Sequence, residues 1–502
     1  MTDVAMILEG TYPYVAGGVS SWVHALITGM PDVRFGLIFI AANREWEKSM
    51  KFTLPPNVDY LLELYVYEMV TARLPRRGPR KEAWDAIERF YFEYLQGKFT
   101  METWEKLYKY LSGDPYRALD IAELAFSYKT WERLVAYYRK HGSSVSFVDF
   151  YWTWRFAVYP IFQLFCMEIP FAKVYHAICT GWAGLIGVMG SRKHKSPLIL
   201  TEHGIYTNER KIEISQSEWI YTEKDEGLTL RRDVGFFKEL WINIFLALGK
   251  LTYDKCSKIY TLYGGNKKME TTYGANPDMI EVIPNGVKID QYIPKNPVEK
   301  PEGVFIIGFV GRVVPIKDVK TFIRACRIVV EKFPNTEIDV IGPYDEDKEY
   351  SQECMDLTAL LGLSEKMHYL GKVDVKQYYP KLDVLVLTSV SEGQPLVILE
   401  GYCSGVPVVA TDVGACSEIV FGLEPEDKAL GPSGFITRVG SPQETAEAII
   451  KIFSDPELME RMRESGRQRV RKYYNYDDMI KRYHDIYDHY REEREKQQVA
   501  AG

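Results

Sequence analysis

The 502-residue chain lacks the cysteine pattern of a disulfide-bonded or zinc-binding protein. Its seven cysteines are scattered and odd in number, and no Cys-x-x-Cys pair occurs. This spacing is typical of free thiols in a reducing compartment. No His/Cys ligand pairing stands out among the eight histidines, so we expect no bound metal.

An export signal and a clear membrane span are also missing. The first nine residues contain neither a basic region nor an apolar run of signal length. Residues 174–191 carry no formally charged side chain over 18 positions, which is the lower edge of a spanning length. Their four glycines, histidine and threonine favour a buried strand, a glycine loop and a packed helix. We therefore expect a cytoplasmic protein.

Positive charge is not in excess, because the net charge is −7. Nothing in the composition favours nucleic-acid binding. Apolar residues make up 46% and charged residues 26% of the chain, as in an ordinary globular protein. A chain of 502 residues is too long for one compact core, so two or three domains are expected.

The first thirty residues have the pattern of a β-α unit. Residues 4–8 are a short apolar run suited to a buried parallel strand, and Ala16-Gly17-Gly18 interrupts the pattern. One helical stripe follows, with apolar residues at Val19, Trp22, Val23 and Leu26.

Strand and helix signals recur along most of the chain. They lie at residues 145–150, 174–178, 197–202, 258–263, 305–310, 338–341, 384–388 and 408–410. This alternation predicts an α/β fold with two Rossmann-like, doubly wound parallel-sheet domains facing a cleft. A linker near 289–301 separates a predicted domain at 1–290 from one at 301–473.

Residues from about 65 to 140 depart from this alternation. They are rich in Tyr, Trp, Glu, Lys and Arg at helical spacing, and they predict a helical insertion in the first domain. The insertion contains a basic run at residues 73–81. This run is either a solvated loop broken by proline or a docking patch for a partner or an anionic membrane surface.

Two glutamates frame the segment Ser391-Glu-Gly-Gln-Pro-Leu-Val-Ile-Leu-Glu400, which follows an apolar strand. Gly393 and Pro395 make a turn before a helix that is predicted to start near Leu396. Glu392 is expected at the carboxyl edge of the sheet, where a carboxylate can accept short bonds from sugar hydroxyls. The helix N-terminus offers N–H groups to a phosphate. Alternatively, the glutamates are a loop carboxylate and a helix-surface residue.

A second segment, Gly308-Phe-Val-Gly-Arg-Val-Val-Pro-Ile-Lys-Asp318, also follows a buried strand. Arg312 and Lys317 put two cations at the start of a βα loop. Fixed cations stabilise the charge that develops on a diphosphate leaving group. The alternative is that Lys317 is solvated and Arg312 pairs with a carboxylate.

Two further signals are weaker. The Gly17-Gly18 turn lets backbone approach a phosphate closely, although it is neither a G-x-G-x-x-G motif nor a P-loop. Thr201-Glu-His-Gly-Ile-Tyr206 puts His203 just past a strand end. That histidine either faces a ligand or is satisfied by a backbone carbonyl.

The order of these motifs, with Ile283-Pro-Asn-Gly-Val287 before the linker, resembles the family 4 retaining glycosyltransferases of GT-B fold. The resemblance covers nearly the whole chain except the insertion. Ala5-Met-Ile-Leu-Glu-Gly-Thr-Tyr-Pro-Tyr-Val-Ala-Gly-Gly-Val-Ser20 and Leu200-Thr-Glu-His-Gly-Ile-Tyr206 are similar to the soluble glycosyltransferases of Pel exopolysaccharide biosynthesis.

The resemblance implies a role for each motif. The donor-binding residues it implies are Gly17, Gly18, Arg312, Lys317, Glu392, Gly393, Gln394, Pro395, Leu396 and Glu400. The residues it implies in catalysis are His203, Glu392, Arg312 and Lys317. Within these sets, Arg312 and Lys317 would hold the diphosphate and Glu400 the ribose. The resemblance also implies that a helix at 474–491 crosses back onto the first domain.

The activity implied is retaining, metal-independent transfer of a hexose from a UDP-sugar, without a cofactor. Glucose is the first choice for the sugar, and N-acetylhexosamine is the alternative. The implied acceptor is a growing extracellular polysaccharide, and the implied partner is an inner-membrane synthase or export complex. The aromatic insertion would contribute either to the acceptor groove or to a contact with a membrane-protein partner. Other functions left open are a nucleotide-sugar epimerase or phosphorylase and a non-catalytic scaffold subunit.

Overall fold

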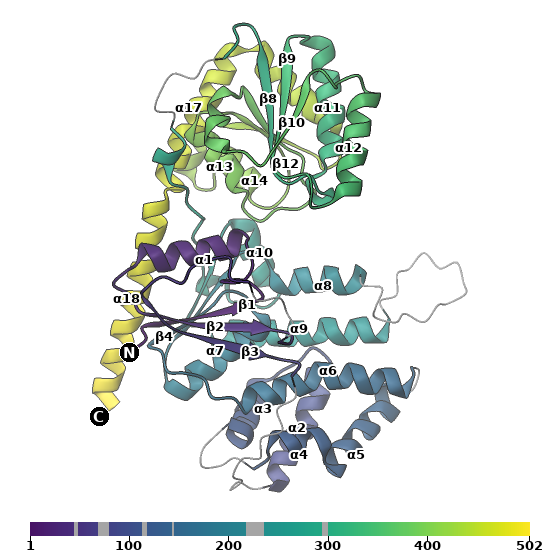
Figure 1. Cartoon of the computed structure of the whole chain (residues 1–502). Coiled ribbons are helices and arrows are strands. Elements are labelled where there is room, and N and C mark those ends of the chain that lie inside the picture. Colours follow the sequence, from purple (N-terminus) through teal and green to yellow (C-terminus); the bar gives the residue numbers. More distant parts are fainter. Residues whose placement is uncertain are drawn as a thin grey trace. The chain divides into compact units, whose positions relative to one another are not determined.

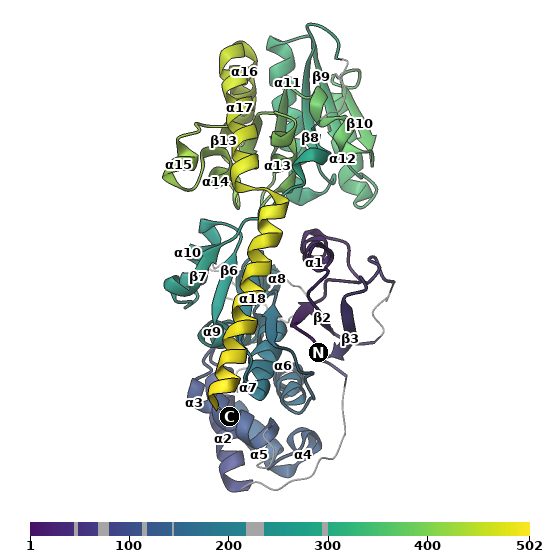
Figure 2. The same ribbon diagram turned by 90° about the vertical axis from the view of Figure 1, so that its left-hand side faces the viewer.

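The computed structural model describes residues 1–44, 49–68, 80–112, 118–142, 145–216, 235–293 and 300–501. The chain forms two compact units (Figure 1, Figure 2). Unit 1 comprises Met1–Tyr260, Lys267–Glu281 and Tyr483–Gly502, and unit 2 comprises Thr261–Asn266 and Val282–Arg482. Most of the basic run at 73–81 and the centre of the linker at 289–301 lie outside the described residues.

Unit 1 is built on a seven-stranded sheet with the order β3-β2-β1-β4-β5-β6-β7. The strands are β1 (Val4–Glu9), β2 (Phe35–Ala41), β3 (Val58–Tyr65), β4 (Val174–Ala177), β5 (Leu198–Glu202), β6 (Lys258–Thr261) and β7 (Ile280–Val282). Strands β1 to β5 pair in parallel. The strand order reverses direction between β1 and β4, which is the switch point of a doubly wound sheet.

Helices connect the strands of unit 1. They are α1 (Gly18–Gly29), α7 (Gly181–His194), α8 (Tyr206–Gln216), α9 (Phe236–Lys255) and α10 (Gly264–Thr272). The uncharged stretch at 174–191 forms β4 and most of α7, as predicted. A Cβ at Gly187 would lie 2.6 Å from the Leu198 side chain, so α7 needs glycine to pack this closely. Within the described part of the chain, no helix combines the length and apolar character that a membrane crossing needs.

The segment between β3 and β4 is helical, as predicted. Its α-helices among the described residues are α2 (Arg80–Tyr94), α3 (Met101–Leu107), α4 (Ile121–Phe126), α5 (Tyr128–Tyr137) and α6 (Phe147–Phe165), with π-helical turns at Tyr108–Ser112 and Tyr138–Gly142. The helices continue beyond the expected end near 140, and residues 147–150 begin α6 instead of forming a strand. Phe150, Trp154 and Phe162 are buried in the aromatic core of the segment, which explains why this apolar run is helical.

Unit 2 contains a six-stranded sheet with the order β10-β9-β8-β11-β12-β13. The strands are β8 (Phe305–Val310), β9 (Thr336–Ile341), β10 (Met367–Gly371), β11 (Val384–Leu387), β12 (Val408–Thr411) and β13 (Gly434–Thr437). Each strand pairs in parallel with its neighbours. No strand was predicted at β2, β3, β7, β10 or β13. Except for the buried β2, these are edge strands with partly exposed residues and hence a weak apolar pattern.

The helices of unit 2 complete a second doubly wound domain. They are α11 (Val319–Lys332), α12 (Lys348–Leu360), α13 (Leu396–Cys403), α14 (Cys416–Phe421), α15 (Pro425–Lys428), α16 (Pro442–Ser454) and α17 (Pro456–Tyr473). The fold therefore consists of two parallel α/β sheets, as predicted from the alternation of strand and helix signals.

Helix α18 (Tyr476–Ala501) begins in unit 2 and belongs to unit 1 from Tyr483 onward. It extends beyond the expected end at residue 491. Arg494 explains this extension, because its guanidinium donates to the Ser196 hydroxyl at 2.9 Å and lies 4.7 Å from the centre of the Phe171 ring. The last turns of the helix are thus anchored to unit 1.

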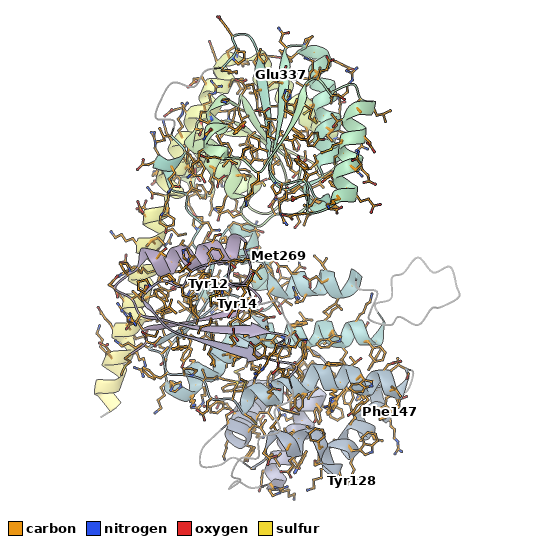
Figure 3. The ribbon with its side chains drawn as sticks, viewed as in Figure 1. Tyr12, Tyr14, Tyr128, Phe147, Met269 and Glu337 are labelled. Atoms are coloured by element: carbon orange, nitrogen blue, oxygen red, sulfur yellow. The ribbon has the colours of Figure 1, made fainter. Side chains whose placement is uncertain are left out.

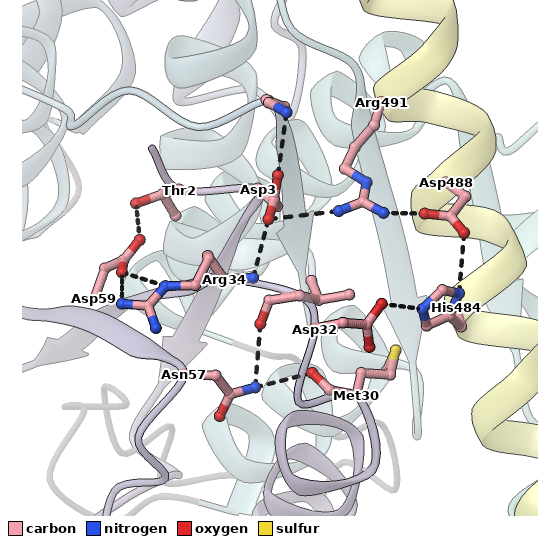
Figure 4. A network of polar contacts seen from close by, with 12 residues as sticks. Thr2, Asp3, Met30, Asp32, Arg34, Asn57, Asp59, His484, Asp488 and Arg491 are labelled. Carbon is pink, nitrogen blue, oxygen red and sulfur yellow. Dashed lines mark hydrogen bonds and ion pairs between the residues drawn. The ribbon is translucent and has the colours of Figure 1, made fainter.

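Polar contacts at the amino end of β1 join α18 to the rest of unit 1 (Figure 4). Arg491 pairs with Asp488 and lies 3.4 Å from an Asp3 oxygen. The two ring nitrogens of His484 lie 2.8 Å from Asp32 and 3.0 Å from Asp488. The hydrogen bond to Asp32 raises the pKa of His484 above its ordinary value.

We expect the contribution of His484 to stability to depend on pH. A raised folded-state pKa means that the protonated ring stabilises the fold below the unfolded pKa of about 6.5, and that this stabilisation is lost as pH rises through the folded pKa. His484→Gln should lower the free energy of unfolding by about 0.5–1 kcal/mol at about pH 5.5 and by less at about pH 8.5. Denaturant titrations at both pH values check this.

His489→Gln, at an exposed position on the same helix, is the matched control. An equal loss of stability at both pH values in His484→Gln would contradict the ion-pair interpretation.

Candidate active site

In unit 2, two predicted motifs meet at the switch point of the sheet. Strands β8 and β11 are neighbours, with Val384 paired to Ile307 and Leu385 to Gly308. The Gly-Arg-x4-Lys segment follows β8, and the Glu-x7-Glu segment follows β11. Ligands of open α/β sheets bind outside the carboxyl ends of the strands at this point.

The switch point of unit 2 holds an ion pair between Lys317 and Glu392. The Lys317 ammonium donates to Glu392 Oε1 at 2.5 Å, and the Ser389 hydroxyl donates to the same oxygen at 2.6 Å. The side chains of Lys317 and Glu392 are only 20% and 12% exposed. In such a partly desolvated site their charges are screened less than at the open surface.

The loop that carries Lys317 is fixed to the end of β11. The Thr388 hydroxyl lies 3.0 Å from the carbonyl oxygens of both Lys317 and Asp318, and the Val390 N–H donates to Ile316 O at 2.8 Å. Asp318 adopts a left-handed conformation (φ 43°) and caps α11. The position of the ammonium is therefore set by both strand ends.

Arg312 has a different partner from Lys317. Its guanidinium donates to Glu346 Oε2 at 2.9 Å, and the two side chains are 54% and 45% exposed. An exposed pair of this kind contributes little to stability and can exchange readily. The alternative in which Arg312 pairs with a carboxylate therefore holds in this structure, and its role toward a diphosphate stays a prediction.

The helix that follows Glu392 begins at Leu396, as predicted. No side chain caps its N-terminus, which Pro395 precedes, and its first turn carries no acidic residue. Gly393 O accepts the Ala415 N–H at 2.8 Å. Gly414 has φ 54°, and a Cβ there would lie 2.2 Å from Gly393 O. The loop before α13 is thus built by close backbone contact.

Gln394 positions the Ile283-Pro-Asn-Gly-Val287 motif. Its amide oxygen accepts the Asn285 N–H at 2.7 Å, and its amide nitrogen donates to Asn285 O at 3.3 Å. A Cβ at Gly286 would lie 2.5 Å from Asn475 O, which accounts for glycine in the motif. The motif therefore connects the loop before α13 to the segment before α18.

Glu400 lies on α13 and contacts two tyrosines. Its Oε1 accepts from the Tyr292 hydroxyl at 2.9 Å and its Oε2 from the Tyr379 hydroxyl at 2.7 Å. Burial, followed by the Glu400 charge, raises the pKa of Tyr379 well above its usual value. The two tyrosines are 108 and 21 residues from Glu400 in the chain, so no local pattern predicts these contacts. The ribose-binding role of Glu400 stays a prediction.

In unit 1, the glycine turn and the histidine are connected by a tryptophan. Gly17 and Gly18 are exposed, and a Cβ at either position would meet nothing within 4 Å. Packing therefore does not explain these glycines, and the N-terminus of α1 is open to a ligand. Trp22 of α1 packs edge-on against His203, with ring centres 4.5 Å apart. Burial lowers the pKa of His203 to about 4, so its ring is neutral near pH 7.

Two carboxylates of unit 1, the half-buried Glu9 and the buried Glu202, were not among the predicted site residues. Glu9 ends β1 at the switch point, where it accepts from the Tyr206 hydroxyl and from the Trp182 N–H at 3.1 Å. Glu202 ends β5 and accepts from the Tyr253 hydroxyl at 2.5 Å. Burial raises the pKa of both groups, that of Glu202 to about 7. An acidic residue that ends an apolar run was the signal available in the sequence.

The loop after β9 contains an Asp-x-Asp string, Asp345-Glu346-Asp347. Two of its members are engaged within the protein, since Glu346 pairs with Arg312 and Asp347 caps α12 through the Tyr350 N–H at 3.0 Å. Among the residues that the structure describes, no group of three or more His, Cys, Asp or Glu side chains is placed to hold a metal ion.

Comparison with known proteins gives a family for each part of the chain. Residues 2–278 match the family model described as "Domain of unknown function (DUF3492)". Residues 291–469 match the model described as "Glycosyl transferases group 1".

Curated relatives match part of the chain. A D-inositol 3-phosphate glycosyltransferase of Nocardia farcinica is 28% identical over 208 residues, which cover 39% of this chain and 44% of that protein. An uncharacterized glycosyltransferase of Haemophilus influenzae is 25% identical over 223 residues, covering 44% of this chain and 58% of that protein. The chain spans about half the length of the curated relatives it matches.

Solved structures match over both units. Sucrose-phosphate synthase from Thermosynechococcus elongatus has a TM-score of 0.54 at 16% identity, covering 99% of this chain and 100% of that one. HepE of Anabaena, in complex with UDP, has a TM-score of 0.56 at 14% identity, covering 97% and 99%. These likenesses show the GT-B fold that the motif order predicted. The chain therefore belongs to the family described as domain of unknown function DUF3492, and it combines that domain with a glycosyl transferases group 1 domain in a GT-B fold.

Proposed function

We propose that the chain is a retaining, metal-independent glycosyltransferase that moves a hexose from a UDP-sugar to a growing polysaccharide. Glucose is the favoured sugar, and N-acetylhexosamine is the alternative. The proposed acceptor is a Pel-type polysaccharide of a biofilm matrix, because residues 5–20 and 200–206 resemble PelF, the soluble glycosyltransferase of Pel biosynthesis. A cytoplasmic location, at the inner face of the membrane beside a synthase or export complex, belongs to the same proposal.

The observation that carries this proposal is the Lys317–Glu392 pair beside the open N-terminus of α13. A cation and the positive end of a helix suit a diphosphate, and a carboxylate suits the hydroxyls of the attached sugar. Both features lie where doubly wound sheets bind ligands. A hydrolase acting on a glycosidic bond would not require Lys317 and the helix N-terminus, which are the phosphate-binding groups proposed here.

The proposed reaction is a substitution on one face of the sugar. The bond between C1 and the diphosphate oxygen breaks as the acceptor oxygen bonds to C1 on the same side, through an oxocarbenium-like state. The acceptor's proton passes to the departing phosphate oxygen, so no protein nucleophile is needed. Lys317 and the N-terminus of α13 stabilise the charge on the leaving group. A neutral His203 can hydrogen-bond to the transferred sugar without adding charge.

The names of similar proteins support the donor and the type of reaction. HepE of Anabaena was crystallised with UDP, with UDP and glucose, and with UDP-glucose. The D-inositol 3-phosphate glycosyltransferases are, by their name, sugar-transferring enzymes. These similarities favour a UDP-sugar over other activated sugars.

Isothermal titration calorimetry with UDP, ADP, GDP and a panel of UDP-sugars tests the proposal. We expect UDP to bind more tightly than ADP or GDP and one UDP-sugar to bind more tightly than the others. Absence of binding by every nucleotide would exclude a transferase and favour a scaffold subunit. Binding followed by release of an epimerised or phosphorolysed sugar would favour the other enzyme class.

Lys317→Ala should weaken UDP affinity by roughly 10- to 100-fold, because it removes one charged hydrogen bond to the diphosphate. Arg312→Ala should weaken it too. Lys320→Ala, which removes a cation of α11 paired with Glu353, is the matched control and should leave the affinity unchanged. If the Lys317→Ala/Arg312→Ala double variant is active with unchanged UDP affinity, the phosphate site is assigned wrongly.

Substitution of Glu392 and of Glu400 should affect different steps of the reaction. Glu392→Ala should lower the turnover rate more than the affinity for UDP, because it removes a contact to the sugar. Glu400→Ala should weaken UDP binding, because it removes the proposed ribose contact. Turnover with a UDP-sugar and calorimetry with UDP alone measure both. The reverse pattern would exchange the two roles.

EDTA should leave the activity unchanged, because the proposed leaving-group stabilisation comes from side chains and a helix end. Initial rates before and after dialysis against EDTA check this. A lasting loss that Mg²⁺ or Mn²⁺ restores would overturn the metal-independent mechanism.

A further inference from the structure

Helix α6 has an apolar face that the protein core does not cover. Val148, Trp152 and Phe156 recur at intervals of four residues and are 61%, 49% and 47% exposed. The opposite face is buried, with Phe150 and Trp154 in the core. A surface helix ordinarily carries polar residues on its outer face, and contiguous exposed apolar surface marks a binding site.

Rings from neighbouring elements continue this face. Phe126, Tyr128 and Trp131, from α4 and α5, are 58%, 73% and 46% exposed. Tyr128 and Phe147 lie at the outer side of the helical insertion (Figure 3). Except for Val148, every strongly exposed large apolar residue described on α4, α5 and α6 is aromatic.

Three of these side chains and two further tyrosines form a continuous series of ring contacts, which we call the aromatic ladder. It runs through Trp131, Tyr151, Trp152, Phe156 and Tyr67, with successive ring centres 6.4, 5.4, 6.1 and 5.9 Å apart. The ladder therefore extends from α5, along α6, to the residue that follows β3 by two positions.

The inner end of the ladder lies at the carboxyl edge of the unit 1 sheet. The Tyr67 N–H donates to Ala42 O at 3.0 Å, just past the end of β2. Ala42 follows Ile40, the β2 partner of Glu9, by two residues, so Tyr67 lies at the same sheet edge as the carboxylate at the switch point. Burial, followed by the charge of Glu9, raises the pKa of Tyr67 to about 12, and Arg210 opposes this.

The chemistry of the ladder suits a sugar chain. The apolar faces of pyranose rings stack on aromatic rings, while their hydroxyls need donors and acceptors at the rim. Arg155 supplies donors there, because its guanidinium lies 5.8 Å from the Phe126 ring and 5.9 Å from the Trp152 ring and donates to the Tyr151 hydroxyl. A face that inserts into lipid would carry several aliphatic side chains such as leucine, whereas Val148 is the single aliphatic side chain among the strongly exposed large apolar residues described on α4, α5 and α6. Protein interfaces also favour Trp, Tyr and Arg, but the continuity with Glu9 favours a substrate.

We propose that the aromatic ladder binds the growing oligosaccharide acceptor and guides it to the carboxyl edge of the unit 1 sheet. This inference rests on the proposed function and names the acceptor as a linear oligosaccharide several sugars long. The outer rings hold sugars remote from the reaction, and the inner end presents the chain near Glu9.

Calorimetry on the full chain tests the ladder with three hexasaccharides: β-1,4-linked glucose, β-1,4-linked N-acetylglucosamine and α-1,4-linked glucose. At least one should bind. Trp152→Ala and Phe156→Ala should each weaken its binding by roughly 10-fold, the size expected when one stacking ring is removed. Trp152→Phe keeps a ring and should lose less. Val148→Ala, on the same exposed stripe but without a ring, is the matched control.

UDP affinity is measured in every variant and should not change. If UDP binds normally but no hexasaccharide binds, or if binding is unaffected in Trp152→Ala, the ladder proposal is overturned and the proposed function stands. If the wild-type chain binds no nucleotide, the proposed function fails. Trp152-dependent binding to vesicles of phosphatidylglycerol and phosphatidylethanolamine, without binding to any hexasaccharide, would assign the face to a membrane and overturn the ladder.

Discussion

The parallel pairing of β8 with β11 is the contact on which the Lys317–Glu392 site of unit 2 depends. Lys317 and Glu392 are 75 residues apart in the chain, and this pairing brings them to the same sheet edge. Thr388 and Ser389, directly after β11, then hold the Lys317 loop and the Glu392 carboxylate. A shift in that register would move both anchors and separate the charges.

Close backbone contacts hold the loops of unit 2 in place, as the strand pairing holds its sheet. Gly342, with φ 142°, lets the end of β9 approach Gly311, where a Cβ would lie 2.1 Å from the carbonyl oxygen. Gly414 makes the same kind of contact with Gly393. Glycine is needed at 342 and 414 for both backbone angle and space, so these positions are structural. Gly17 and Gly18 differ, because neither packing nor a positive φ accounts for them.

The two units differ in the chemistry that they offer to a ligand. Unit 2 presents an ion pair and an open helix N-terminus, which suit a charged phosphate. The corresponding edge of unit 1 has a neutral His203, and burial raises the pKa of Glu9 and Glu202. A neutral imidazole, carboxylates that accept hydrogen bonds, and aromatic rings suit hydroxyl-rich sugars. This difference is consistent with a charged donor and an uncharged acceptor.

Local patterns in the sequence were enough to predict the two α/β sheets, the helical insertion and the start of α13 at Leu396. These features depend on the spacing of apolar residues and on turn residues, which act over a few positions. The partners of Arg312 and Glu400 could not be predicted, because Glu346, Tyr292 and Tyr379 are distant in sequence and only the folded chain brings them near.

In the aromatic insertion, too, local sequence predicts the helices but not the contacts of individual side chains. Its composition indicated helices, and helices form because the rings pack against one another. Which rings remain outside was decided by tertiary structure alone. Trp152 and Trp154 lie two positions apart on α6, yet one is exposed and the other is buried. The sequence by itself determined the fold class and the order of the motifs, since these depend on local periodicity. The side chains that face a ligand were decided by long-range packing, which selects one face of each helix and one edge of each sheet.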